Sequence, residues 1–222
     1  MTAPRITRPY GAVRTDILAA ATRLFADRGY ADVALRDIAK KADVHLPAIY
    51  KAFKDKRELY VQCCIKVFER GTLDIASGIK ADYSDHENVL AYTTSLANMY
   101  VTDPLVAKLA QRCVLDHDRE LIDFIMQQAG SEYHGRIIEI LERIVGERAK
   151  RTFFAISALT FGAIQLSEFR LPGQDEPNPD SVEDLSLYAL DSLLPNIDWA
   201  AVQADLHTRD APLKKKTRAA KG

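Results

Sequence analysis

Apolar residues recur every three or four positions over most of this 222-residue chain, and they nowhere alternate as in a half-buried strand. That spacing predicts amphipathic helices and therefore an all-α fold. The pattern breaks at 78–85, at 103–104 and at Gly130, so several helices are expected rather than one long rod. Three prolines and a glycine within 171–180 predict a loop, and no internal repeat is present.

The N-terminal residues predict a head of three short-to-medium helices. Residues 1–10 hold two prolines and two arginines and are expected to form a flexible basic arm. A helix that begins near Val13 should end at Gly29, because glycine takes the left-handed conformation of a helix cap at little cost. Two short helices, over about 35–42 and 45–52, should follow with a brief turn between them.

Capping residues mark further helix starts. Asp55 and Glu58 have the spacing of a capping box, so a long helix should begin just after Asp55. Asp103 followed by proline predicts another start at 103–104. A last short helix is expected over about 198–206, and 207–222 is expected to be a disordered basic tail.

Charge is segregated along the chain, although the formal net charge is only -1. Residues 1–70 contain 14 Lys and Arg against 8 Asp and Glu, whereas residues 71–207 contain 10 against 22. A basic N-terminal part on an acidic body is typical of a head that binds a polyanion. A chance asymmetry of solvated faces would give the same counts, so charge alone leaves the two readings open.

Composition and the absence of known motifs argue against several other classes of protein. Cys63, Cys64 and Cys113 give no disulfide framework and no paired metal spacing, so a reduced, cytoplasmic setting is expected. No stretch reaches the roughly 18 apolar residues of a membrane span, and the N-terminus lacks the apolar core of a signal peptide. Enzyme motifs are absent, and no cofactor is predicted. His117 and Glu120 share a helical face, which leaves a metal carrier open as an alternative.

Spaced residues of the N-terminal head resemble the N-terminal domain of the TetR/AcrR family of transcriptional regulators, over about residues 11–62. The resemblance implies an all-α chain with a helix-turn-helix DNA-binding domain, whose motif spans about 34–53. It also implies a helical ligand-binding and dimerisation domain over 63–206. The matching positions are Leu24, Phe25, Gly29, Tyr30, Ile38, Ala39, Ala42, Val44, Tyr50, Phe53, Lys56 and Leu59.

The same resemblance implies a set of DNA contacts. Tyr50 and Lys56 match the family's phosphate contacts, and the chemistry agrees, because a hydroxyl donates to phosphate oxygens and a helix N-terminus favours an anion. Lys51 can reach guanine O6 or N7, whereas Leu46 and Pro47 can read only shape and thymine methyl groups. The predicted DNA-binding residues are Arg36, His45, Leu46, Pro47, Tyr50, Lys51, Lys54 and Lys56.

The sequence departs from the family at the starts of both short helices. Ala34 stands where threonine is usual, and His45 stands where serine or a similar cap is usual. A missing N-cap costs about 1 kcal/mol unless Asp32 takes over. Ala48 and Ala52 also replace polar residues, so two phosphate partners are expected to be missing.

Two C-terminal segments, 151–170 and 182–194, are apolar nearly all round. Such helices must be buried on every side, which predicts a four-helix interface between two chains. A single large monomeric core is the alternative. The predicted interface residues are Phe153, Ile156, Phe161, Ile164, Leu187, Leu190 and Leu194.

An unknown small-molecule effector is expected to bind among the helices between about 86 and 165. Aromatic and methionine residues at helical spacing are more often core than pocket, so the candidate linings compete with ordinary packing. The candidates are Tyr92, Leu96, Met99, Cys113, His117, Phe124, His134 and Phe161.

These observations predict a sequence-specific DNA-binding regulator. The expected form is a homodimeric repressor that a small molecule releases from a palindromic double-stranded DNA operator. Two alternatives stay open: a similar head on a body that responds to a protein partner, and a helical metal or ligand carrier.

Overall fold

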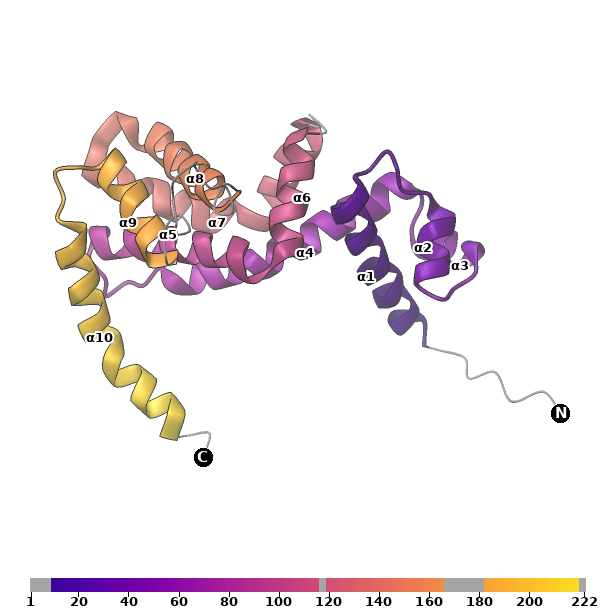
Figure 1. The fold of residues 1–222 in the computed structure, drawn as a ribbon, viewed down its shortest axis with the longest axis horizontal. Coiled ribbons are helices and arrows are strands. Elements are labelled where there is room, and N and C mark those ends of the chain that lie inside the picture. Colours follow the sequence, from indigo (N-terminus) through magenta and orange to yellow (C-terminus); the bar gives the residue numbers. More distant parts are fainter. Residues whose placement is uncertain (1–8, 116–118, 166–181, 220–222) are drawn as a thin grey trace, which may run out of the picture. The chain divides into compact units, whose positions relative to one another are not determined.

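The computed structural model describes residues 9–115, 119–165 and 182–219, and every regular element in these ranges is a helix (Figure 1). The predicted all-α class is therefore confirmed. The helices form two compact units. The N-terminal unit comprises the chain up to Arg70 together with 104–130, and the C-terminal unit comprises 71–103 together with 131 onward. None of the helices in the described ranges is both long and apolar enough to cross a membrane.

The head of the N-terminal unit contains α1 (Tyr10–Arg28), α2 (Leu35–Lys41), α3 (Leu46–Ala52) and the first part of α4 (Lys56–Gly78). Both predicted short helices are present, and α1, α2 and α3 pack against one another (Figure 1). Their shared core includes Phe25, Ile38, Ile49 and Phe53, all almost fully buried. Ile49 and Phe53 are four residues apart, so one face of α3 is fixed in this core.

Backbone conformation ends α1 where the sequence predicts. Gly29 has φ +82°, and its N–H donates to the Phe25 carbonyl over 2.8 Å. Asp43, in the turn between α2 and α3, also has a positive φ of 53°, a conformation that aspartate tolerates better than most residues. The start of α4 is capped as predicted, because the Glu58 N–H donates to the Asp55 carboxylate over 2.8 Å.

The N-terminal unit also includes α6 (Pro104–Leu115) and the first part of α7 (Arg119–Val145). The predicted helix start at 103–104 is confirmed, and α6 packs on α1. The compact unit therefore extends beyond the expected DNA-binding domain. The predicted break at Gly130 is wrong, because α7 continues through it. A helical glycine costs only about 1 kcal/mol, which a long helix can absorb.

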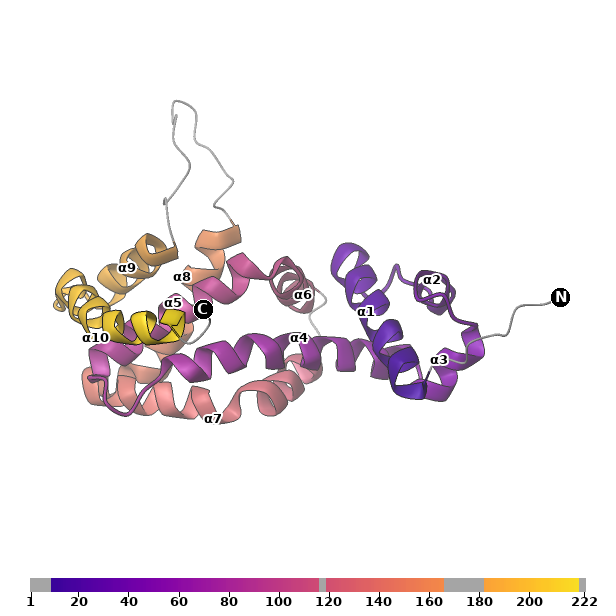
Figure 2. The same ribbon diagram turned by 90° about the horizontal axis from the view of Figure 1, so that it is seen from below.

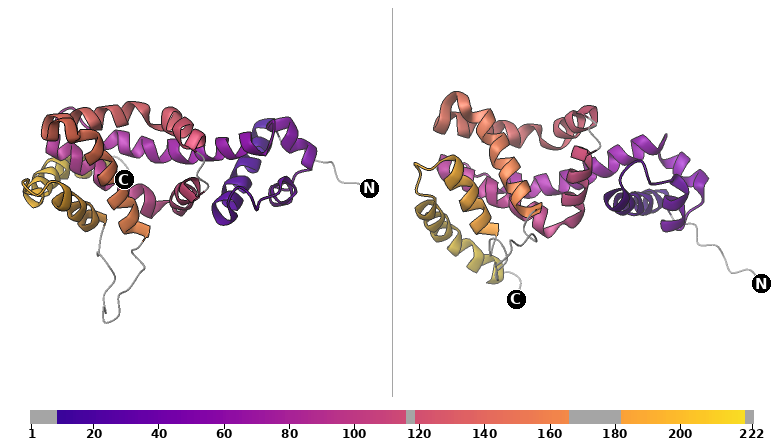
Figure 3. Two further views of the ribbon diagram at one scale, coloured as in Figure 1. Left: turned by 90° about the horizontal axis from the view of Figure 1, so that it is seen from above. Right: turned by 45° about the horizontal axis from the view of Figure 1, so that its top comes forward.

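In the C-terminal unit, α5 (Asp85–Thr102) is the central helix. It packs against α8 (Ala149–Gln165), α9 (Val182–Leu193) and α10 (Trp199–Ala219), and α10 also lies beside α9 (Figures 2 and 3). A short 3-10 turn, η1 (Gly146–Arg148), links α7 to α8. The largest side chains of this core are Tyr92 and Trp199, each about 1% exposed.

The end of the chain differs from its prediction. The last helix runs to Ala219 instead of ending near Leu206, so it covers most of the segment expected to be a disordered tail. Contacts beyond Leu206 explain part of the difference: Arg209 donates to the Asp82 carbonyl over 2.7 Å. The expected arm, apart from its last residues, and the loop expected over 171–180 lie outside the described residues.

Candidate nucleic-acid interface

Helix α3 has one buried and one exposed face. Proline occupies its first turn, where no backbone N–H is needed, and His45 is its N-cap residue. Pro47, Tyr50 and Lys51 are exposed, whereas Ile49 is buried. Tyr50 is 56% exposed, so its ring is not a core residue. A helix this short, whose buried face packs on α1 and α2, can enter a major groove about 12 Å wide and present its exposed side chains to bases.

Contacts from α1 hold the C-terminal end of α3. The Tyr10 hydroxyl donates to the Lys51 carbonyl over 3.1 Å, and the Lys51 ammonium lies 5.7 Å from the centre of the Tyr10 ring. The Arg14 guanidinium stacks on Phe53 at 4.8 Å. Sequence reasoning missed Tyr10 and Arg14, because no local spacing links them to a helix some forty residues away. Both add polar or cationic groups beside the exposed face.

Lys56 is not part of the exposed face of α3. Its ammonium donates to the Ala31 carbonyl over 3.3 Å and lies 4.4 Å from the centre of the Tyr30 ring. Partial burial lowers the pKa of Lys56, and the carboxylate of Asp32 opposes that shift. Its predicted phosphate contact stays a prediction, and it would require the amine to exchange the Ala31 carbonyl for a phosphate oxygen.

The starts of the two short helices lack side-chain caps. Ala34 is the N-cap residue of α2, and no side chain caps this helix, so Asp32 does not replace the usual threonine. The His45 side chain likewise makes no capping bond to α3. Arg36 and Lys54 are exposed, as a backbone-contact role requires. Leu46 is half-buried, so only part of its side chain can reach DNA.

Two of the expected effector residues belong to the N-terminal unit. Cys113 is buried there, with its sulfur 3.8 Å from the Tyr60 hydroxyl. It is therefore a packing residue of this unit, whereas Tyr92 belongs to the C-terminal unit, and the effector role of Cys113 stays a prediction. Phe124 also lies in the N-terminal unit and is 42% exposed. His117 lies outside the described residues.

The adjacent thiols of Cys63 and Cys64 in this unit are also buried, which makes them unreactive. Burial raises the pKa of Cys63 to about 12, and a hydrogen bond with the Cys113 thiol, together with burial, raises the pKa of Cys64. A thiol that stays protonated is a poor nucleophile. Among the described residues, no group of three or more His, Cys, Asp or Glu side chains could hold a metal ion.

The other described effector candidates belong to the C-terminal unit, where Tyr92 and His134 both pack on Phe153. The Phe161 ring lies 5.1 Å from that of Tyr100, and the His134 ring lies 5.2 Å from that of Phe153. Tyr92, Leu96 and Met99 are buried on α5. We call this group, together with Tyr133, Ser157 and Thr160, the aromatic cluster.

Besides the His134 imidazole, the polar groups of the aromatic cluster are hydroxyls. The oxygen atoms of Tyr92 and Ser157 lie 3.4 Å apart, and burial raises the pKa of Tyr100 to about 12. The Thr160 hydroxyl is buried and has no hydrogen-bond partner among the described residues. Tyr100, Tyr133, Ser157 and Thr160 were missed by sequence reasoning, since isolated hydroxyls on apolar helices carry no distinctive spacing.

The expected dimer interface stays a prediction, and its residues differ in exposure. Phe153, Ile156, Leu190 and Leu194 are buried inside their own subunit. Phe161, Ile164 and Leu187 are half-buried. The large apolar side chains left exposed on α8 and α9 are Phe154 at 67%, Leu159 at 39% and Tyr188 at 69%.

Comparisons with known proteins agree with this arrangement. Residues 17–63 match the family described as bacterial regulatory proteins, tetR family. The HTH-type transcriptional activator FasR of Mycolicibacterium smegmatis is 29% identical over 144 residues, which are 54% of this chain and 62% of that protein. The match thus spans less than two thirds of the relative's length.

Solved structures resemble both parts of the fold. A regulatory protein in the tetR family from Rhodococcus RHA1 matches with a TM-score of 0.64 at 18% identity, covering 82% of this chain and 95% of that one. The fatty acid degradation regulator FadR from Bacillus halodurans matches with a TM-score of 0.63 at 16% identity, covering 86% and 97%. Residues 17–63 therefore match the TetR family of bacterial regulatory proteins, and the fold of the chain resembles a solved structure from that family.

Proposed function

We propose that this chain is a homodimeric transcription regulator that inserts α3 into the major groove of a palindromic DNA operator. The observation that carries the proposal is the exposed face of α3, where Tyr50 and Lys51 stand outward on a helix fixed by Ile49 and Phe53. Lys51 supplies a donor for guanine, and the Tyr50 hydroxyl supplies a donor for phosphate. Such a regulator acts in the cytoplasm, where bacterial DNA lies.

Phosphate contacts set the strength of the proposed binding. Arg36 and Lys54 are exposed cations at either end of the helix-turn-helix, and the whole N-terminal segment has excess positive charge. If each subunit neutralises about four phosphates, the logarithm of the binding constant should fall with the logarithm of salt concentration with a slope near -7 for a dimer.

The experiment selects an operator from a random duplex pool and titrates it by fluorescence anisotropy between low and high salt. A slope shallower than about -2 would contradict binding through phosphates. A scrambled duplex of equal length measures non-specific affinity. Lys150→Ala, an exposed lysine on α8, serves as the matched control for substitutions in the head.

The proposed dimer uses the exposed side chains of α8 and α9. Phe154 and Tyr188 are each about two-thirds exposed, and Leu159 is a further exposed apolar side chain on α8. A second copy of the chain would cover these rings and set two reading helices about 34 Å apart, or a multiple of it. Two half-sites at that spacing make the palindrome.

The aromatic cluster is the proposed effector site. Its buried hydroxyl at Thr160 and its neutral phenols offer hydrogen bonds in an otherwise apolar setting, as small-molecule sites do. An effector that prefers one conformation of the dimer by 1–3 kcal/mol would change operator affinity about 5–150-fold.

The direction of regulation is a separate matter from operator binding. The sequence predicts a repressor that its effector releases, whereas the relative FasR is an activator. We retain effector-controlled operator binding as the proposal and favour repression as its outcome, with activation as the second candidate. In vitro transcription from the selected operator, with and without the protein, distinguishes the two by the sign of the change.

A further inference from the structure

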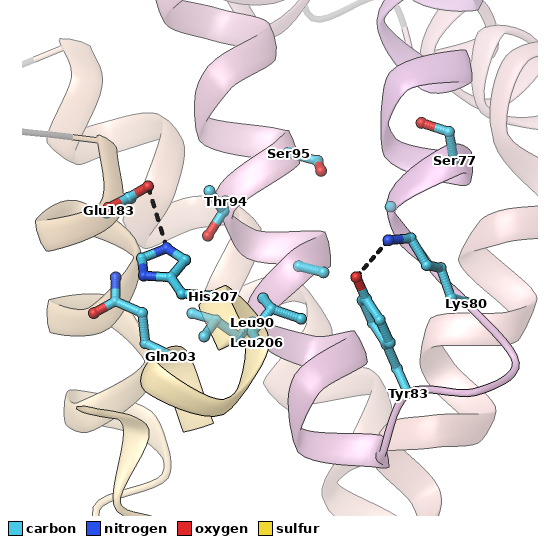
Figure 4. Close-up of a pocket in the computed structure, with 12 residues that line it drawn as sticks. Ser77, Lys80, Tyr83, Leu90, Thr94, Ser95, Glu183, Gln203, Leu206 and His207 are labelled. Atoms are coloured by element: carbon cyan, nitrogen blue, oxygen red, sulfur yellow. Dashed lines mark hydrogen bonds and ion pairs between the residues drawn. The ribbon is translucent and has the colours of Figure 1, made fainter. Parts of the chain in front are cut away.

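A pocket of about 240 Å³ opens between four helices of the C-terminal unit (Figure 4). Its walls come from the end of α4 and the loop after it, from α5, from the first turn of α9 and from α10. On α5 it is lined by Ala91, Thr94 and Ser95, which share a helical face. Tyr92 and Leu96 of the aromatic cluster lie on another face of α5. The pocket is therefore separate from the proposed effector site.

One side of the pocket carries a positioned cation. The Lys80 ammonium donates to the Tyr83 hydroxyl and lies 4.4 Å from the centre of that ring. The buried Asn88 side chain fixes the loop that bears both residues. It accepts from the Lys80 N–H over 2.8 Å and donates to the carbonyls of Lys80 and Tyr83 over 3.0 and 3.3 Å. Lys80 is thus held in place without a ligand.

The opposite side carries a carboxylate. Glu183, in the first turn of α9, lies 3.8 Å from the imidazole of His207 on α10, and Gln203 lies beside them. Figure 4 shows these three side chains across the pocket from Lys80 and Tyr83. The side chain of Glu183 is 53% exposed, so this side also opens to solvent.

The wall formed by α10 is anchored at both ends of the pocket. Trp199 is buried and donates from its indole to the Leu194 carbonyl over 3.2 Å. Two residues beyond His207, the Arg209 guanidinium lies 3.3 Å from the carboxylate of Glu87, a residue that is 3% exposed. Because α10 is fixed on either side, the pocket is preformed. Ligand binding therefore carries no entropic cost of ordering this wall.

We propose that this pocket binds a small zwitterion of the ω-amino acid class, with its carboxylate at Lys80 and Tyr83 and its ammonium at Glu183. Opposite charges on facing walls favour a molecule that carries both, since a ligand of one charge leaves the other wall uncompensated. The volume is below the roughly 300–1,000 Å³ of sites for drug-sized ligands, so a short chain fits. Leu90 and Leu206 provide apolar surface for its methylene groups.

Isothermal titration calorimetry of the full chain tests the proposal with glycine, 4-aminobutanoate and 6-aminohexanoate. Butanoate and butylamine are the matched probes, because each keeps one charge of 4-aminobutanoate on the same carbon chain. We expect at least one ω-amino acid to bind about tenfold or more tightly than both single-charge probes, as one lost charged contact implies.

Two variants place the binding in this pocket. Lys80→Met and Glu183→Gln should each weaken the best ω-amino acid about tenfold or more. Lys150→Met and Glu147→Gln remove exposed charges elsewhere in the same unit and should leave the affinity unchanged. Thermal unfolding of every variant without ligand verifies that it is folded.

Three outcomes would overturn the proposal. In the first outcome, none of the ω-amino acids binds detectably at concentrations up to about 10 mM. In the second, butanoate binds as tightly as 4-aminobutanoate, which makes the pocket a simple anion site. In the third, both pocket variants bind like the parent. Operator titration of the same samples is independent of all three, so failure here leaves the DNA-binding proposal untouched.

Discussion

The Lys108 ammonium lies 2.8 Å from the Asp27 carboxylate and joins α6 to the last turn of α1. Arg112 strengthens the same junction by donating to the Asp27 carbonyl over 3.0 Å. These two contacts tie α6 to the helix that supports the helix-turn-helix. The hydrogen bond from Lys108, with its positive charge, holds the pKa of Asp27 below its ordinary value.

Asp27→Asn should therefore destabilise the protein slightly at neutral pH. Both partners are about half exposed, so we expect a loss below about 1 kcal/mol. Because the folded pKa is lowered, the contribution is present above the unfolded pKa of about 3.9 and disappears as the pH falls through the lower folded value. Urea unfolding at pH 7 and pH 3 should show the parent and variant converging at pH 3.

Salt provides an independent check on the same pair. The difference between parent and Asp27→Asn should also shrink at 1 M salt, where exposed charges are screened over about 3 Å. Asp205→Asn removes an exposed carboxylate from α10 and is the control. An Asp27 effect of undiminished size at pH 3 would show that the amide disturbs packing instead.

Gly29→Ala should destabilise the head by about 1–3 kcal/mol. Gly29 has φ +82° and ψ 170°, a region that residues with a Cβ avoid, and an added Cβ would lie 3.5 Å from the Arg112 guanidinium. Gly11→Ala is the matched control. It lies in the first turn of α1 with no heavy atom within 4 Å of an added Cβ, so it should stabilise by up to about 1 kcal/mol. Equal effects of the two substitutions in chemical unfolding would contradict this account.

Ala34→Thr should stabilise the head by about 1 kcal/mol, because a hydroxyl at the N-cap satisfies an orphan N–H of α2. Ala34→Val has nearly the same shape without the hydroxyl and separates capping from β-branching. Chemical unfolding of the three proteins measures the effect. A gain in the valine variant equal to that of threonine would rule out the cap as its cause.

Local rules account for the parts of the fold that sequence predicts. Gly29 ends α1, Asp55 and Glu58 begin α4, and Pro104 begins α6, because each depends on the backbone within one turn. The exposed face of α3 follows for a similar reason, since Ile49 and Phe53 at helical spacing determine which side is buried. Three of the predicted DNA-contact residues, Pro47, Tyr50 and Lys51, lie on the remaining surface.

Tertiary packing determines what the sequence could not predict. A helix that is apolar all round does not reveal which stripe meets its own core, so the sequence predicts Leu190 at an interface although the structure buries it fully. Helical spacing also predicts Cys113 and Tyr92 as linings of one pocket, yet they belong to different units. The contact of Lys56 with Tyr30 joins distant positions, and no spacing encodes it.

Substitutions on α3 should separate base reading from phosphate contact. Lys51→Ala should relax specificity at one base pair by about 1–3 kcal/mol, because its ammonium is the expected guanine donor. Tyr50→Phe removes only a hydroxyl and should weaken all duplexes alike. Titration of single-base operator variants measures both effects. If Lys51→Ala weakens every duplex equally, its contact is to the backbone instead.

Dimerisation is tested most sharply by comparing exposed with buried positions. Phe154 and Tyr188 are about two-thirds exposed, so Phe154→Glu and Tyr188→Glu should leave the subunit folded while placing a charge in the proposed interface. Leu190→Arg should instead unfold the C-terminal unit, because it buries an unpaired charge in the core. Circular dichroism distinguishes these two results before any binding is measured.

Sedimentation and operator titration then complete the comparison. We expect the parent to sediment as a dimer, the two glutamate variants as folded monomers, and both variants to lose most of their operator affinity, since a single short helix reads too few base pairs. Arg136→Glu places the same negative charge at an exposed position of α7, a different helix, and should remain dimeric. A folded monomer that binds operator as tightly as the parent would refute the dimer mechanism, and a monomeric parent would refute the interface itself.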